Sequence, residues 1–353
     1  EAKSLGNLGL SYYSMGDYPK AIEYHEYSLK IAQEIKDRNS EGNALGNLGV
    51  AYHALGDYPK AIEYHEHWLK IAQAIKDRKG EGAALNNLGV TYYKIGNQRN
   101  AESTLFKSMK VLESLRGGLK DNNKITIFEE QNRTYRTLQQ VLIAQNKTDA
   151  ALLIAERGRA RAFVELLASK SDNPNKQLST LPNTEQIKQI AKLQNSTLAQ
   201  YSIITDEFKV GGQRKVKESK LYIWVVKPTG EIAFKQVDLK PINKSLQELV
   251  ISARDSIGVR SSNMFDVAVV TPSPEDPTQK LQQLHKLLIA PIADLLPKDP
   301  NERVIFIPQE SLFTVPFPAL LDEKGKYLVE KHTILTAPSI QVLDFTRQQK
   351  LRN

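Results

Sequence analysis

A forty-residue segment recurs along the first half of the chain, and this internal repeat constrains the fold more than any other feature. Residues 5–42 align with residues 45–82 without a gap, and 28 of the 38 paired positions are identical. A more divergent third copy starts at Leu85, and a fainter fourth spans residues 135–168. Repeats of this length are typical of solenoids, in which each unit buries its apolar face against the next. The sequence therefore predicts a stacked helical array over residues 1–168.

Each copy contains two helical patterns separated by a turn. In the second copy, apolar side chains recur at three- and four-residue steps from Leu45 onward, which is one face of a helix. Gly56 then interrupts the pattern, Asp57 is placed to cap the next helix, and Pro59 suits its first turn. Gly49 is small at a point where the two helices must approach closely. Because one hairpin cannot cover its own apolar face, we expect neighbouring copies to stack.

The pattern resembles the tetratricopeptide repeat, whose marks are a large apolar residue, Leu-Gly, Tyr and then Ala in the second helix. The resemblance implies an α superhelix whose first helices line a concave groove for a protein partner. The forty-residue spacing is similar to that of kinesin light chains and spindle-orientation adaptors. The expected repeats span about residues 3–42, 43–82, 83–120 and 124–168. In the second copy the marks fall on Leu45, Leu48, Gly49, Tyr52 and Ala61.

Polar and aromatic side chains recur at two phases of the first helices, and these are the candidate partner-binding residues. An asparagine side chain donates and accepts hydrogen bonds at once. Two interpretations stay open: the asparagines hold the backbone of an extended partner peptide, as related adaptors do, or they bond to the neighbouring repeat. His25 and His65 lie a full repeat apart and are expected to pack rather than to bind metal. The candidate residues are Asn7, Asn47 and Asn87 at one phase and Tyr13, His53 and Tyr93 at the other.

The second half of the chain changes character after a polar stretch. Residues 169–184 are polar, contain prolines and indicate a linker. Beyond them, strand and helix patterns alternate, which predicts an α/β sheet domain over residues 185–353. The expected strands are 199–204, 221–226, 231–237, 303–307 and 332–335, and the expected helices are 184–194, 244–256, 279–296 and 339–349.

Four strings in this half resemble the start of a CHAT domain, the caspase-like module that follows tetratricopeptide repeats in bacterial proteins. They read AERGRARA at 155–162, LYIWVVKPTGEI at 221–232, VIFIPQESLFTVPFPAL at 304–320 and GKYLVEKHTILTAPSIQVL at 325–343. The resemblance implies a partial caspase-like α/β domain, truncated before the family's catalytic His and Cys. Neither family string is present, and His332 lies at a different family position, so no catalytic residue is assigned. Ser311 lacks the glycine elbow of a serine nucleophile and is interpreted as a turn.

Composition excludes several classes of function. The 353 residues contain no cysteine, which rules out disulfides, thiolate zinc sites and a cysteine nucleophile in this chain. We therefore expect no enzyme activity from it, and no metal or cofactor motif is found. Apolar runs reach six residues at most, whereas a bilayer span needs about 20, so no membrane partner is expected.

The net charge of +8 is spread along the chain rather than clustered. A nucleic-acid footprint is a basic stripe, so the charge permits a nucleic-acid partner without arguing for one. The densest basic stretch, residues 214–220, is interpreted as a solvated loop. Arg157, Arg159 and Arg161 alternate in the fourth repeat and are interpreted either as a phosphate or RNA contact or as partners of nearby acids.

The combined hypothesis is a protein–protein interaction module. The repeat groove binds a partner or regulatory peptide, and the module is fused to the non-catalytic start of a caspase-like cysteine peptidase domain in a longer, cytoplasmic polypeptide. One alternative is a pure scaffold whose caspase-like domain is inactive. Another is a component of a ribonucleoprotein-associated protease complex, whose binding would fall steeply with salt.

Overall fold

A computed structural model describes residues 1–115, 121–169, 183–210, 213–258 and 277–350 of the chain. The chain divides into two compact units, and each is described here by itself. The first comprises Glu1–Ile154 with Glu207–Val216, and the second comprises Ala155–Asp206 with Lys217–Asn353. Most of the expected linker, residues 170–182, lies outside the described residues.

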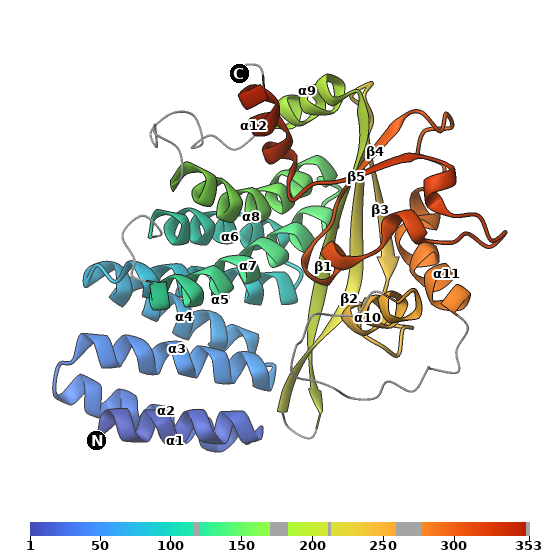
Figure 1. Ribbon diagram of the computed structural model, residues 1–353. Helices are drawn as coiled ribbons and strands as arrows, with labels where there is room; N and C mark the ends of the chain where they lie inside the picture. The colour runs from blue at the N-terminus through green and yellow to red at the C-terminus, as the bar shows by residue number, and fades with distance from the viewer. Residues whose placement is uncertain (116–120, 170–182, 211–212, 259–276, 351–353) are drawn as a thin grey trace. The chain divides into compact units, whose positions relative to one another are not determined.

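The first unit is built from helical hairpins that stack one after another, as the sequence predicted (Figure 1). Each helix packs against the next along the chain from α1 to α7. The helical repeat fold is thereby confirmed. The helices are α1 (Ala2–Met15), α2 (Tyr18–Glu34), α3 (Arg38–Leu55), α4 (Tyr58–Ala74), α5 (Arg78–Lys94), α6 (Gln98–Ser114), α7 (Asp121–Ala144) and α8 (Thr148–Ser169), the last of which runs on into the second unit.

Repeated caps fix where these helices begin and end. The Asp57 carboxylate accepts a hydrogen bond from the Lys60 amide at 3.2 Å, and proline occupies the first turn of α4. The preceding helix, α3, ends at Gly56 with a φ of 93°, a left-handed conformation that costs glycine little. Asp17 and Gly16 do the same between α1 and α2. The helix end at Gly56 and the cap at Asp57 that the sequence predicted are confirmed.

Glycines allow the paired helices to approach closely. Gly49 on α3 lies directly against the imidazole of His65 on α4, and a Cβ atom at this position would overlap the ring. Gly9 lies against His25 in the same way, and Gly89 lies against Leu105. The two histidines are buried packing residues, as expected.

The second unit contains a mixed five-stranded sheet in the order β3-β2-β1-β4-β5. Strand β1 pairs with β4 and β4 with β5 in parallel, whereas β2 and β3 are antiparallel. This confirms the predicted α/β architecture. Its elements are α9 (Thr184–Gln194), β1 (Ser196–Val210), β2 (Gln213–Val226), β3 (Ile232–Asp238), α10 (Leu246–Ser256), α11 (Pro277–Leu288), η2 (Ala290–Ile292), β4 (Arg303–Ile307), η3 (Glu310–Thr314), η4 (Phe317–Ala319), η5 (Leu328–Glu330), β5 (Thr333–Thr336) and α12 (Ile340–Lys350).

Three elements differ clearly from their predicted extents. Strands β1 and β2 are longer than expected, and residues 214–220, interpreted as a loop, belong to β2. Neighbouring strands bond through their backbones, so a charged segment can extend a hairpin without apolar alternation. The helix predicted to reach residue 296 ends at Leu288 and is followed by η2. Pro291 lacks the amide hydrogen that would continue an α-helix.

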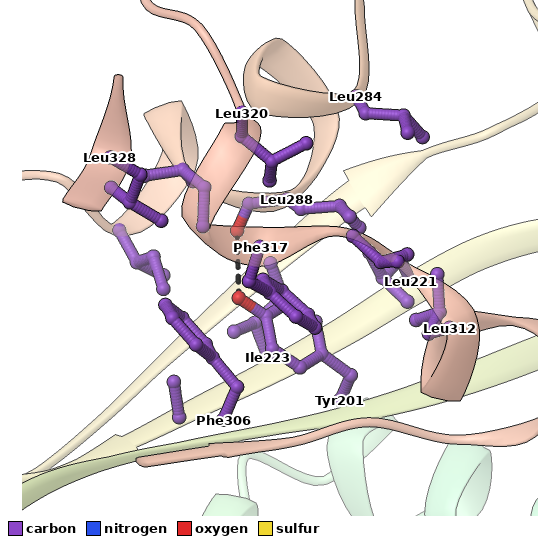
Figure 2. Packing of buried hydrophobic residues seen from close by; sticks show 14 of the residues in the cluster. Tyr201, Leu221, Ile223, Leu284, Leu288, Phe306, Leu312, Phe317, Leu320 and Leu328 are labelled. Atoms are coloured by element: carbon purple, nitrogen blue, oxygen red, sulfur yellow. Dashed lines mark hydrogen bonds between the residues drawn. The ribbon is translucent and has the colours of Figure 1, made fainter. Parts of the chain in front are cut away.

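One face of the sheet carries the main apolar core, which α10, α11 and the 3-10 turns cover (Figure 2). The rings of Phe306 on β4 and Phe317 on η4 stack with centroids 4.3 Å apart. Tyr201 on β1 lies beside both rings, and its hydroxyl donates to the Leu288 carbonyl at 2.9 Å. That bond satisfies the only polar atom of a fully buried side chain and ties β1 to the end of α11.

Candidate functional site

The first helices of the repeats each carry a stripe of side chains that the fold leaves exposed or half-buried. The stripe positions are separated by four, three and four residues, which places them on one face of a helix. None of them is buried, whereas the opposite face of α3 and α5 is buried. The stripes contain two lysines and no carboxylate. We call them the helix-one stripes: Lys3, Asn7, Leu10 and Ser14 on α1; Asn43, Asn47, Val50 and Ala54 on α3; Ala83, Asn87, Val90 and Lys94 on α5.

The three asparagines predicted to bind a partner lie in the middle of these stripes. Asn7 is exposed, and Asn47 and Asn87 are half-buried. The Asn87 side-chain oxygen accepts from the neighbouring Asn86 amide at 3.3 Å. Among the described residues, no hydrogen bond is made by the Asn47 amide group. The three asparagines thus lie at the same position of α1, α3 and α5, and the Asn47 amide is available to a ligand.

The second predicted phase is more involved in packing than the first. His53 contacts the Tyr58 ring edge-on at a centroid distance of 5.3 Å, and Tyr13 meets Tyr18 at the same distance. His53 Nδ1 also lies 3.0 Å from the hydroxyl of Thr91, in the next repeat. Tyr13 and His53 therefore support the hairpins as well as bordering the helix-one stripes. Tyr93 holds the same position on α5 and is half-buried.

A polar contact between successive repeats was not foreseen from the sequence. The Gln33 amide on α2 donates to Glu41 on α3 at 3.4 Å, and Gln73 on α4 donates to Glu81 on α5 at 3.2 Å. Both glutamates are also paired with an arginine one helical turn before them. The signal was present, because the glutamine and glutamate columns are identical between the first two copies.

In the second unit, a buried carboxylate and an arginine on α8 bind main-chain groups. Glu156 is fully buried and accepts from the Gln341 amide at the start of α12 at 2.8 Å. Arg159 donates to the carbonyls of Ile307, at 2.9 Å, and Pro308, at the end of β4. Burial raises the pKa of Glu156, and burial lowers the pKa of Arg159 to about 10. Arg159 thus holds the backbone, and this contact favours a structural role over the phosphate contact considered from the sequence.

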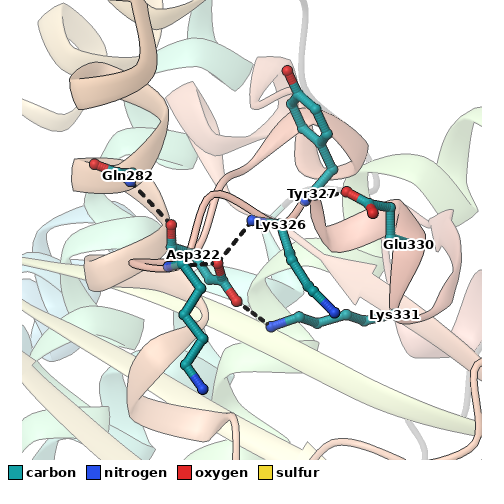
Figure 3. Close-up of polar contacts among 7 residues, drawn as sticks. Gln282, Asp322, Lys326, Tyr327, Glu330 and Lys331 are labelled. Atoms are coloured by element: carbon teal, nitrogen blue, oxygen red, sulfur yellow. Dashed lines mark hydrogen bonds and ion pairs between the residues drawn. The ribbon is translucent and has the colours of Figure 1, made fainter.

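A second polar cluster orders the turn after η4 (Figure 3). The Asp322 carboxylate accepts from the backbone amides of Lys324 at 2.8 Å and Lys326 at 2.9 Å, and it pairs with the Lys331 ammonium. The hydrogen bond from Lys331 is the main cause that lowers the pKa of Asp322 to about 2. Gln282 of α11 donates to the Asp322 carbonyl at 3.1 Å, which anchors the turn.

Neither of the two residues weighed for catalysis, Ser311 and His332, makes a side-chain hydrogen bond among the described residues. Ser311 is in η3, and its hydroxyl is enclosed with no hydrogen-bond partner among the described residues. His332 is buried, and burial lowers its pKa. Within the described ranges, no three His, Asp or Glu side chains are close enough to share a metal ion. None of the described helices combines the length and apolarity needed to cross a bilayer.

Two known protein families match separate stretches of the chain. The tetratricopeptide repeat family matches residues 1–74 and 42–114, and the CHAT domain family matches residues 278–353. Tetratricopeptide repeat protein 28 of Mus musculus is 28% identical over 176 residues, which are 47% of this chain and 7% of that protein. Its Homo sapiens counterpart is 31% identical over 110 residues, which are 30% of this chain and 4% of that protein. The chain thus spans a small fraction of the length of these relatives.

One solved structure has a low similarity to about half of the chain. BtubC from P. vanneervenii is 21% identical with a TM-score of 0.41, and the match covers 52% of this chain and 70% of that one. The tetratricopeptide repeat match agrees with the helical hairpins of the first unit. Residues 1–114 thus match the tetratricopeptide repeat family, and residues 278–353 match the CHAT domain family.

Proposed function

We propose that the chain is a protein-interaction module whose helix-one stripes bind an extended segment of a partner protein. The observation that carries this proposal is that each of the three stripes sets an asparagine one turn before an apolar side chain, at positions that the fold leaves exposed or half-buried. Asn47 offers a donor and an acceptor to a peptide backbone, and Leu10, Val50 and Val90 offer apolar contacts beside the asparagines.

The charge of the helix-one stripes indicates which charge the partner segment should carry. Lys3 and Lys94 are exposed at opposite ends of the set, and no stripe position carries a carboxylate. Complementary charge speeds encounter and disfavours partners of like charge. The preferred segment is therefore extended, mildly acidic and free of lysine clusters.

The test uses a library of labelled octapeptides, sorted by charge, and measures binding by fluorescence anisotropy. Acidic and neutral sequences with alternating apolar residues should bind, and the double variant Asn47→Ala, Asn87→Ala should lose that binding without a fall in Tm. Asn100→Ala, on the second helix α6, is the matched control, because Asn100 is an exposed asparagine outside the helix-one stripes. Retained binding together with a collapsed Tm would assign the asparagines to stacking instead.

The CHAT match supports a finer proposal about the whole protein. CHAT domains are related to caspase-like cysteine peptidases, and we infer that partner capture by the repeats serves such a domain in a cytoplasmic protein. This chain has no cysteine and so lacks the nucleophile that the chemistry requires. Incubation with the same peptide library should give no cleavage, and inhibitor-sensitive turnover would contradict this assignment.

A further inference from the structure

Helix α6, the second helix of the third repeat, carries a basic face that is exposed along its whole length. The five positions of this face are separated by four, four, three and four residues, which places them on one side of the helix. All five side chains are exposed, and three of them are cations. Because the cations are not neighbours in the chain, the folded helix rather than the linear sequence brings them together. We call this set the α6 basic face: Arg99, Ser103, Lys107, Lys110 and Ser114.

The carboxylates of α6 do not neutralise this face, because each of them is bound elsewhere. Glu102 accepts from the Lys147 ammonium at 2.6 Å. Glu113 is buried and accepts from the Tyr135 hydroxyl at 2.8 Å. Among the described residues, none of the three cations of the α6 basic face makes a side-chain hydrogen bond or an ion pair. The face therefore presents three uncompensated positive charges to solvent.

The equivalent positions of the two preceding repeats do not carry this charge. They are Pro19, Glu23, Tyr27, Lys30 and Glu34 on α2, and Pro59, Glu63, His67, Lys70 and Ala74 on α4. One lysine and two glutamates give the α2 positions a net charge of −1, and one lysine and one glutamate give the α4 positions a net charge of 0 with histidine neutral. The α6 basic face has three cations and no carboxylate, a net charge of +3. The repeat fold does not require these cations, because the first two repeats form the same hairpin without them.

We propose that the α6 basic face binds the phosphate backbone of a nucleic-acid duplex. Arginine, lysine and serine side chains all bind phosphate oxygens in nucleic-acid complexes. From Arg99 to Lys110 the face extends about 16 Å along the helix axis, which is the rise of about five nucleotides in one strand of duplex DNA. A cation that neutralises a phosphate releases a condensed counterion, so exposed and unpaired cations contribute to affinity without any apolar contact.

The composition of the face argues against other polyanionic partners. It contains no aromatic side chain, whereas single-stranded nucleic acids are bound largely by stacking of their bases on aromatic rings. It contains no apolar side chain either, whereas a helix that lies on a membrane buries an apolar face and a protein interface has an apolar core. The backbone of a duplex needs neither. The proposal is independent of peptide binding, because the helix-one stripes lie on α1, α3 and α5.

The test measures binding of a short labelled DNA duplex by fluorescence anisotropy as the KCl concentration is raised. The triple variant Arg99→Gln, Lys107→Gln, Lys110→Gln should bind the duplex more weakly than the original chain does. The slope of log K against log[KCl] should become shallower by about 0.9 for each lost cation, or about 2.7 in all. No binding of the duplex by the original chain at low salt would overturn the proposal.

The matched control removes the same charge from three exposed lysines on other parts of the chain, Lys30→Gln, Lys192→Gln and Lys298→Gln. It should keep the affinity and the slope of the original chain. Both triple variants should retain its Tm, because all six substitutions are at exposed positions. Equal losses of affinity in the two variants would refute the proposal, since the overall charge rather than the α6 basic face would then hold the duplex.

Two further measurements separate the remaining outcomes. Glu63→Ser combined with His67→Lys gives α4 the residues that α6 has at these positions, and it should strengthen duplex binding and steepen the slope. An unchanged slope in this variant would contradict the role given to these positions. The duplex should also bind more tightly than a single strand of the same length or an octaglutamate peptide. Tighter binding of either one, lost in the α6 triple variant, would assign the face to that polyanion and contradict the duplex.

Discussion

The imidazole of His65 occupies the space that a side chain on Gly49 would need. This contact sets how closely the two helices of the second repeat approach each other. The first repeat repeats it with His25 and Gly9, and the third uses Leu105 and Gly89. The glycine is therefore kept in all three hairpins while the ring is exchanged for an apolar side chain in one.

Gly49→Ala should destabilise the repeat unit, because the added methyl group must displace the buried His65 ring. Overpacking of a core typically costs about 1–3 kcal/mol in the free energy of unfolding. Gly6→Ala is the matched control, since a Cβ there would lie 3.5 Å from the Ser28 hydroxyl, an ordinary contact. The control should be neutral or stabilising by up to about 1 kcal/mol, because alanine favours helix. Urea unfolding followed by circular dichroism measures both, and equal effects would argue against the packing explanation.

Mild acid should weaken the repeat unit. Burial lowers the pKa of His65 to about 3 and that of His25 to about 4, whereas a histidine in the unfolded chain titrates near 6.5. The unfolded state thus binds protons first, so stability is full above pH 6.5 and falls as the pH drops below it. The loss for His65 amounts to about 1.4 kcal/mol per pH unit. Urea midpoints measured between pH 8 and pH 5 should decline, and a flat profile would contradict the prediction.

His65→Leu should remove part of that acid sensitivity. The third repeat already carries Leu105 against Gly89, so leucine fits this position of the hairpin. The variant should resemble the original chain at pH 8 and exceed its free energy of unfolding at pH 5 by about 2 kcal/mol, the cost of keeping a histidine neutral. His67→Leu, at an exposed position of α4, is the control and should leave the profile unchanged.

Two substitutions of Asp322 should destabilise the second unit to different degrees. Asp322→Ala removes the acceptor of two backbone amides and the partner of Lys331, and it should cost about 1–3 kcal/mol in the second unit. Asp322→Asn keeps an acceptor oxygen and should cost less. Because the pKa of Asp322 is lowered to about 2, its contribution is complete above the unfolded value and is lost as the pH falls through 2. An Asn variant as damaged as the Ala variant would show that the ion pair, rather than the turn, matters.

Glu156→Ala should destabilise the second unit more than a surface substitution does. It leaves the half-buried Gln341 backbone amide at the start of α12 without its acceptor, which costs about 1–3 kcal/mol. Glu185→Ala is the control, because that carboxylate on α9 is largely exposed. Urea midpoints are compared by intrinsic fluorescence in a Trp68→Phe background, where Trp224, buried in β2, is the one tryptophan left and reports on this unit. Matching midpoints for the two variants would contradict the role assigned to Glu156.

The helices of the repeats could be predicted because their signals lie within one hairpin. Contacts between hairpins and the full length of β2 could not be predicted in this way. The periodic apolar residues, Asp57 and Gly56 fixed the helices because each acts within its own hairpin. Contacts such as that of Gln33 with Glu41 join residues whose partnership depends on how hairpins stack, which periodicity does not encode. The length of β2 was missed because backbone pairing, rather than side-chain alternation, extends it.

The candidate site was predictable to a similar degree. The phase of Asn7, Asn47 and Asn87 follows from the repeat period, and in the structure Asn7 is exposed and the other two are half-buried. The involvement of His53 with Thr91 was not visible, because Thr91 replaces the alanine found at the equivalent position of the preceding repeat. The binding role of the asparagines themselves stays a prediction.

Glu156 and Arg159 have a practical consequence for dividing the protein into fragments. Both lie on α8, well before the polar stretch where a cut between domains would ordinarily be made, yet they anchor the start of α12 and the end of β4. An α/β fragment that begins at residue 185 would therefore leave the Gln341 amide and the Ile307 carbonyl without these partners. Expression of the second unit on its own should start no later than Thr148, so that this helix is retained whole.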